Sequence, residues 1–95
     1  MKANLEEIKN KALPILKQAG VTRSSLFGSY VRGESKEKSD IDFLVDLPRG
    51  KSLFDLVELQ MNLEEALGKK TDVVTYRSLH PLLRDRILKE QVRIL

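Results

Sequence analysis

Two short motifs in the first half of the chain combine residue types that could handle a phosphorylated substrate. Gly28-Ser29 is followed, after ten residues, by Asp40-Ile41-Asp42. A glycine lets the backbone approach a phosphate closely, and a serine hydroxyl can donate a hydrogen bond to it. Residues two apart on a strand point to the same side, so the carboxylates of Asp40 and Asp42 can face one site. The pattern predicts a phosphate-binding turn beside a pair of metal-binding carboxylates.

A carboxylate pair of this kind suits Mg²⁺, which prefers oxygen ligands and the phosphates of a substrate. Two Mg²⁺ ions about 3.5 to 4 Å apart would hold the attacking and leaving oxygens of a phosphoryl displacement. Asp72 lies on another predicted strand and can complete a triad if the two strands are neighbours. We therefore expect Asp40, Asp42 and Asp72 to be the metal ligands and the catalytic carboxylates, with Asp72 on the side of the acceptor hydroxyl.

Arg32 follows Ser29 by three residues and so lies on the same face of the short helix predicted after Gly28. Its guanidinium could bind phosphate oxygens through paired hydrogen bonds, beside the N–H groups that open the helix. The alternative is that Arg32 forms an ion pair with Glu34 or Glu37. We expect Gly28, Ser29 and Arg32 to bind the triphosphate of a nucleotide.

The elements that position these residues follow from hydrophobic periodicity and from turn residues. Helical spacing predicts helices over residues 5–19 and 53–67 and after Pro81, where Ser78 is the expected cap. Short apolar runs predict strands over residues 21–27, 40–47, 70–76 and 92–95, the last at an edge. The fold class is therefore α/β (α+β), a small mixed β-sheet of three to four strands covered by helices. One apolar stripe is expected to pack on this sheet: Leu53, Leu56, Leu59, Leu63 and Leu67.

The composition limits the classes of function. The 95 residues fit one domain, residues 1–95, with 41% hydrophobic residues for its core. Without cysteine and with a single histidine, any metal site must use carboxylates. No apolar run is long enough to cross a membrane, and we expect a cytoplasmic protein. The net charge of +3 is spread among acidic residues without interleaved aromatics, so we do not expect a nucleic-acid partner.

Two longer segments carry a resemblance to a known family: Leu26-Phe27-Gly28-Ser29-Tyr30-Val31-Arg32-Gly33 and Ser39-Asp40-Ile41-Asp42-Phe43-Leu44-Val45. They resemble the DNA polymerase β nucleotidyltransferase superfamily and, within it, the minimal nucleotidyltransferases. The likeness extends to Lys70-Thr71-Asp72-Val73-Val74 and the C-terminal tail. It implies a polymerase β-like core in which Gly28 and Ser29 form the triphosphate turn and Arg32 contacts a phosphate. It also implies that Asp40, Asp42 and Asp72 hold the metal.

The same resemblance implies a partner and a reaction. Minimal nucleotidyltransferases are often encoded beside a helical HEPN protein, as antitoxin and toxin. We therefore expect Mg²⁺-dependent transfer of AMP from ATP to a toxin tyrosine, in a hetero-oligomer. Two alternatives stay open: an antitoxin that neutralises by binding with little turnover, and a transferase whose acceptor is a nucleic acid or a small molecule.

Overall fold

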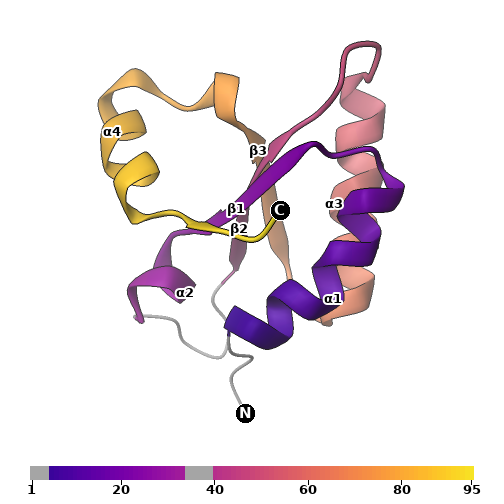
Figure 1. Ribbon diagram of the computed structural model, residues 1–95, viewed down its shortest axis with the longest axis horizontal. Coiled ribbons are helices and arrows are strands. Elements are labelled where there is room, and N and C mark those ends of the chain that lie inside the picture. The colour runs from indigo at the N-terminus through magenta and orange to yellow at the C-terminus, as the bar shows by residue number, and fades with distance from the viewer. Residues whose placement is uncertain (1–4, 34–39) are drawn as a thin grey trace.

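A four-stranded sheet forms the centre of the molecule, and helices lie on both of its sides (Figure 1). The computed structural model describes residues 5–33 and 40–95, so Glu34 and Glu37, the alternative partners of Arg32, lie outside the described residues. The strands are β1 (Arg23–Phe27), β2 (Ile41–Asp46), β3 (Thr71–Thr75) and β4 (Val92–Arg93). Their order is β3-β2-β1-β4; β1 is antiparallel to β2 and β4, whereas β2 and β3 are parallel. The predicted mixed sheet with a C-terminal edge strand is confirmed.

Two long helices and two shorter ones flank the sheet. The helices α1 (Leu5–Gln18) and α3 (Leu53–Leu67) pack against each other on one side. The helices α2 (Ser29–Arg32) and α4 (Pro81–Glu90) lie on the other side (Figure 1). The side that carries α2 is the one on which the predicted site residues must be sought.

The hydrophobic core lies between the sheet and the α1–α3 pair. Its fully buried members include Ile8, Leu16, Leu26, Phe43 and Leu63. Within the stripe predicted on α3, Leu59 and Leu63 are buried, and Leu56 and Leu67 pack against the core. Leu53 is an exception with 73% exposure, because it lies in the first turn, ahead of the turns that contact the core. The expectation of a core position for Leu53 was therefore wrong.

Strand β2 is buried more fully than its sequence predicts. Its alternating residues Ile41, Phe43 and Val45 are all buried, as the period-two pattern requires. Leu44 belongs to the opposite face and is buried as well. Its register partner on β1 is Ser25, whose hydroxyl forms a hydrogen bond with that of the buried Tyr76. Tyr76 therefore shields the centre of this second face. The alternation of apolar and acidic residues over 40–47 predicts a half-buried strand, so this expectation was wrong for Leu44.

The last helix begins later than expected. A 3₁₀ turn occupies Tyr76–Ser78, and the cap of α4 is His80, whose Nδ1 accepts a hydrogen bond from the amide of Leu82. Ser78 was the predicted cap. Pro81 explains the difference, because proline has no N–H to leave unsatisfied and fits the first helical position directly after a cap.

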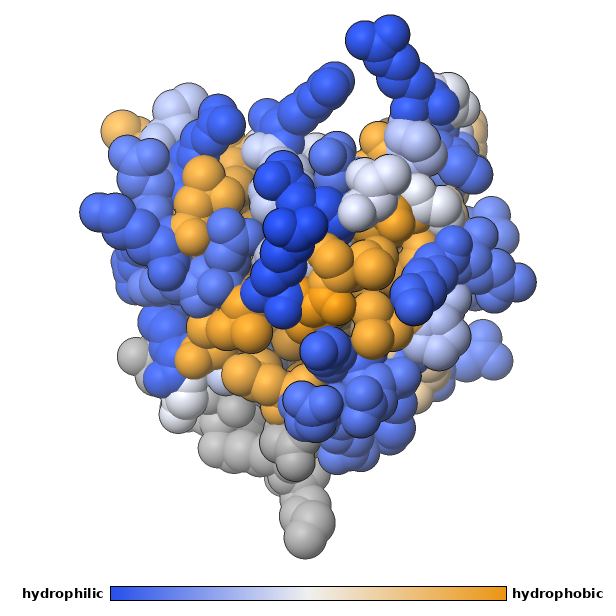
Figure 2. Space-filling view, viewed as in Figure 1, coloured by the Kyte–Doolittle hydropathy of each residue, from blue (hydrophilic) through white to orange (hydrophobic). Residues whose placement is uncertain are grey.

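The surface in Figure 2 mixes hydrophilic and apolar side chains. Apolar side chains gather near the middle of this view, around the C-terminal end of the chain, and hydrophilic side chains surround them (Figures 1 and 2). Within residues 5–33 and 40–95, no helix has the length and apolarity that crossing a bilayer requires.

Candidate active site

Asp42 is the central residue of the predicted constellation. It lies on β2 directly opposite Asp72 of the parallel strand β3 and opposite Phe27 of the antiparallel strand β1. Side chains of register partners point to the same face of a sheet. Asp42 and Asp72 therefore share the face that is turned away from the α1–α3 pair, as the sequence predicted if their strands were neighbours.

The turn that contains Gly28 is in direct contact with Asp42. Gly28 follows β1 with a φ of 81° and a ψ of −154°, and it precedes the single helical turn of α2. A Cβ atom built on Gly28 would collide with the carboxylate oxygen Oδ2 of Asp42. Only glycine fits this place, because it both tolerates the backbone conformation and leaves room for the carboxylate. The phosphate-binding turn and the acidic strand predicted from the sequence thus form one site.

Ser29 and Arg32 are the first and last residues of α2. The amides of Val31 and Arg32 donate to the carbonyl of Gly28, so the amides of Ser29 and Tyr30 precede the first hydrogen bonds of the helix. Gly33 ends the turn with a φ of 74°. Because α2 has only four residues, its dipole is small, and anion binding there would depend on local N–H and side-chain donors.

Asp42 has the perturbed acidity typical of a functional carboxylate. Burial raises its pKa, and repulsion by Asp72 and Asp40 raises it further, to about 6, although the positive charge of Arg32 acts in the opposite direction. These contributions place the three predicted carboxylates and Arg32 in one electrostatic neighbourhood. A cation bound among them would relieve both the repulsion and the loss of hydration.

The three carboxylates are neighbours, but they do not form a closed metal cage. Asp40 is exposed and lies one residue before β2, which begins at Ile41 rather than at Asp40 as predicted, and Asp72 is exposed on β3. Among the residues that the structure describes, no three acidic or imidazole side chains are already gathered closely enough to hold one metal ion. An open arrangement of hard oxygen donors suits Mg²⁺, which keeps waters and uses substrate phosphates as further ligands.

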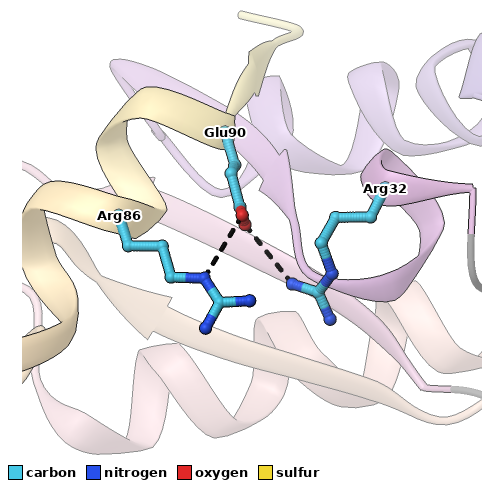
Figure 3. Close-up of polar contacts among 3 residues, drawn as sticks. All are labelled: Arg32, Arg86 and Glu90. Atoms are coloured by element: carbon cyan, nitrogen blue, oxygen red, sulfur yellow. Dashed lines mark hydrogen bonds and ion pairs between the residues drawn. The ribbon is translucent and has the colours of Figure 1, made fainter.

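Arg32 contacts a carboxylate that the sequence analysis did not consider. Its Nη1 lies 3.3 Å from Oε2 of Glu90, in the last turn of α4, and Nε of Arg86 lies 3.3 Å from the other oxygen, Oε1 (Figure 3). Glu90 is 58 residues from Arg32 in the chain. No local spacing connects them, so sequence reasoning without the fold could not identify this contact.

A second group of polar residues that the sequence did not reveal lies on the same face of the sheet. Ser25 is completely buried, and its Oγ is 2.8 Å from the hydroxyl oxygen of Tyr76. The guanidinium carbon of Arg23 lies 4.0 Å from the centre of the Tyr76 ring, which is the geometry of a cation–π contact. Ser25 and Arg23 precede Phe27 by two and four residues on β1, so they share the face of Asp42.

A separate hollow of about 810 Å³ lies between α1 and α3. Its lining includes Gln18, Lys51, Glu58 and Asn62, and none of the six predicted site residues is part of it. The contact between Gly28 and Asp42 therefore defines the candidate site better than the size of a cavity does.

Similarity to known proteins extends over nearly the whole chain. A family model described as a nucleotidyltransferase domain matches residues 9–94. A candidate protein adenylyltransferase of Methanocaldococcus jannaschii, MJ0435, is 61% identical over 92 residues, which are 97% of this chain and 99% of that protein. The protein adenylyltransferase MntA of Thermococcus cleftensis is 44% identical over 75 residues, 79% of this chain and 76% of that protein.

Solved structures show the same fold. A candidate minimal nucleotidyltransferase superposes with a TM-score of 0.81 at 36% identity, covering 95% of both chains. A chain from a toxin–antitoxin crystal structure with AMP-PNP superposes with a TM-score of 0.80 at 27% identity, covering 92% of this chain and 72% of the other. The fold predicted from the sequence and the resemblance stated for its motifs are both confirmed.

Proposed function

Because this chain belongs to the nucleotidyltransferase family, we propose that it transfers AMP from ATP to a hydroxyl group of a separate protein, with Mg²⁺ as cofactor. The contact between Gly28 and Asp42 carries this proposal, since it joins the turn expected to bind phosphate to a carboxylate whose pKa is raised to about 6. Two relatives support the choice of AMP and of a protein acceptor, because both have the name protein adenylyltransferase.

The reaction is an in-line displacement at the α-phosphorus of ATP. The acceptor oxygen forms a bond to this phosphorus, the bond to the bridging oxygen of the β-phosphate breaks, and pyrophosphate leaves with that electron pair. Asp72 accepts the proton of the attacking hydroxyl in this proposal, which its exposure and its position beside Asp42 on the outer strand β3 support. Gly28, Ser29 and Arg32 bind the triphosphate.

Asp40, Asp42 and Asp72 are the residues that would hold Mg²⁺. When bound, the metal would neutralise charge on the phosphates and stabilise the charge that develops as the new bond forms. The fit rests on the donor set, because three neighbouring carboxylates favour a hard cation. Burial, and then repulsion by Asp72 and Asp40, raise the pKa of Asp42 to about 6, and a cation would offset both effects. A bound cation would favour the ionised form of Asp42 and so oppose the rise of its pKa.

The acceptor that we propose is a tyrosine of a helical HEPN-type toxin, which this chain neutralises as an antitoxin within a hetero-oligomer. The structure that is 27% identical comes from a toxin–antitoxin complex with an ATP analogue, which supports both the partner and the nucleotide. An acceptor oxygen must lie about 3 to 3.5 Å from the phosphorus and in line with the leaving oxygen. A docked protein surface supplies that alignment, whereas a free solute does so poorly.

The position of the label in ATP tests this function. The protein is incubated with Mg²⁺ and the proposed HEPN-type partner, using ATP labelled either at the α- or at the γ-phosphate. Nucleotidyl transfer predicts label in the partner from α-labelled ATP alone. Label from the γ-position would instead indicate a phosphoryl transferase. Label from neither, with a partner that still copurifies, would mean that the protein neutralises by binding.

A further inference from the structure

The structure assigns Glu90, at the end of α4, as the positioning residue for Arg32. This inference rests on the proposed function, in which Arg32 binds the phosphates of ATP. Glu90 itself does not touch the nucleotide in this account. It fixes the direction of the long Arg32 side chain, so that the C-terminal helix contributes to a site built mainly by the first half of the chain.

The two oxygens of Glu90 have different guanidinium partners. Oε2 lies 3.3 Å from Nη1 of Arg32, and Oε1 lies 3.3 Å from Nε of Arg86, one helical turn earlier on α4 (Figure 3). Arg86 therefore holds the carboxylate from its own helix, while the other oxygen is directed toward α2. The side chains of Arg32 and Glu90 are 32% and 27% exposed, so water still reaches the pair and its role is one of geometry more than of strong attraction.

Arg32 can contact Glu90 and a phosphate at the same time. A guanidinium has five N–H donors in a rigid fork, and Glu90 accepts from Arg32 through one oxygen. The positive charge of Arg32 also lowers the pKa of Asp42, which places the guanidinium within electrostatic reach of the acidic site. Arg32 thus interacts with Glu90 and with the acidic strand where the phosphates would lie.

Glu90 remains ionised at neutral pH. Burial alone would raise its pKa, but hydrogen bonds from Arg86 and Arg32 outweigh that effect and leave the pKa below its usual value. The ion pair connects α2 to α4, which has no buried residue. Loss of this carboxylate would therefore remove one partner of Arg32 without removing a core contact.

Glu90 could instead weaken nucleotide binding, which is the opposite of what a positioning role predicts. A carboxylate near the triphosphate could repel it or occupy Arg32, in which case its removal would tighten nucleotide binding. Calorimetric titration with AMP-PNP and Mg²⁺ distinguishes positioning of Arg32 from repulsion of the triphosphate. It compares the wild type with Glu90→Gln, Arg32→Ala and the double variant. Asp85→Asn is the matched control, because it removes one negative charge from an exposed position of the same helix.

Positioning predicts that Glu90→Gln weakens AMP-PNP binding about three- to tenfold, the size of a lost contact between neighbouring charged groups. The loss should disappear in the Arg32→Ala background, and Asp85→Asn should bind as the wild type does. In turnover assays KM for ATP should rise while kcat stays within about twofold, which loss of folded protein would not produce. Circular dichroism confirms that each variant is folded.

Unchanged or tighter binding by Glu90→Gln would overturn the inference and leave the proposed function intact. If Glu90→Gln weakened AMP-PNP binding by the same factor in the Arg32→Ala background, the inference would also be overturned, since Glu90 would then act independently of Arg32. Failure of the wild-type protein to bind AMP-PNP would contradict the proposed function itself, and the positioning role with it.

Discussion

The carboxylate of Asp42 occupies the space that a side chain at Gly28 would need. Gly28 also has a φ of 81° and a ψ of −154°, a combination that is nearly confined to glycine. Two independent constraints therefore fix the residue at this turn. The first is local to the backbone, and the second comes from a strand that is antiparallel to the one Gly28 follows.

We predict that Gly28→Ala abolishes transfer and destabilises the fold by about 1 to 3 kcal/mol, because the backbone is strained and Asp42 must move. Gly33→Ala is the matched control. Its φ of 74° makes an alanine unfavourable there too, but a Cβ would meet no atom within 4 Å among the described residues. Urea denaturation should show a loss for both variants, and transfer should survive only in Gly33→Ala. Retained transfer in Gly28→Ala would contradict the contact with Asp42.

Asp42→Asn should stabilise the metal-free protein at neutral pH. The pKa of Asp42 is raised from 3.8 to about 6, so between these values the folded state holds a proton that the unfolded state has lost. The free energy of unfolding of the wild type therefore falls as pH rises through this window, by about 1 kcal/mol after allowance for solvent screening. The asparagine variant lacks this contribution.

Urea titrations of wild type and Asp42→Asn at several pH values, with a chelator present, measure that difference. The advantage of the variant should be absent near pH 3.5 and complete near pH 7. An advantage that does not change with pH would mean that the pKa of Asp42 is not raised in the folded protein.

Asp72→Asn should separate nucleotide capture from activation of the acceptor. Asp72 lies on the outer strand β3 and is exposed, whereas the residues proposed to bind the triphosphate lie around α2. We expect the affinity for AMP-PNP to stay within about threefold of wild type, while the rate of transfer falls by roughly 100-fold or more, as for loss of a general base. Calorimetry measures the affinity for AMP-PNP, and a single-turnover assay measures the rate of transfer. A parallel loss of both would give Asp72 a role in nucleotide binding instead.

Tyr76→Phe should cost about 1 kcal/mol of stability, because it leaves the buried hydroxyl of Ser25 without its partner. Tyr30→Phe is the matched comparison. The hydroxyl of Tyr30 is buried and has no hydrogen-bond partner among the described residues, so its removal should be neutral or stabilising. Thermal unfolding of both variants measures the two changes in stability. An equal loss of stability in the two variants would show that the Ser25–Tyr76 hydrogen bond does not account for the effect of Tyr76→Phe.

The parts of the site that sequence reasoning could predict are those with local signals. Gly28 and Ser29 lie at a strand-to-helix turn, and the alternation around Asp42 indicates a strand with an acidic face, so both followed from spacing alone. The pairing of Asp42 with Asp72 needed one further assumption, that β2 and β3 are neighbours. A helix between two parallel strands made that assumption reasonable.

The parts that sequence reasoning missed depend on contacts distant in the chain. Glu90 reads as one charge among many on a polar helix, and only the fold brings it to Arg32. Tyr76 follows a strand with no pattern that indicates its hydrogen bond to Ser25, 51 residues away. The cap of α4 was misassigned for a local reason, since Ser78 is the better capping residue by type but Pro81 fixes the start of the helix after His80.

Intact mass spectrometry of the partner distinguishes nucleotidyl transfer from binding alone in one measurement. The proposed HEPN-type partner is incubated with ATP, Mg²⁺ and either wild type, Asp40→Asn or Asp42→Asn. We predict that the wild type adds the mass of AMP to the partner, at a tyrosine located by fragmentation, and that both variants stay folded but add nothing. A partner that gains AMP equally with the asparagine variants would contradict the assignment of these carboxylates, and one that is bound but never modified by the wild type would contradict transfer itself.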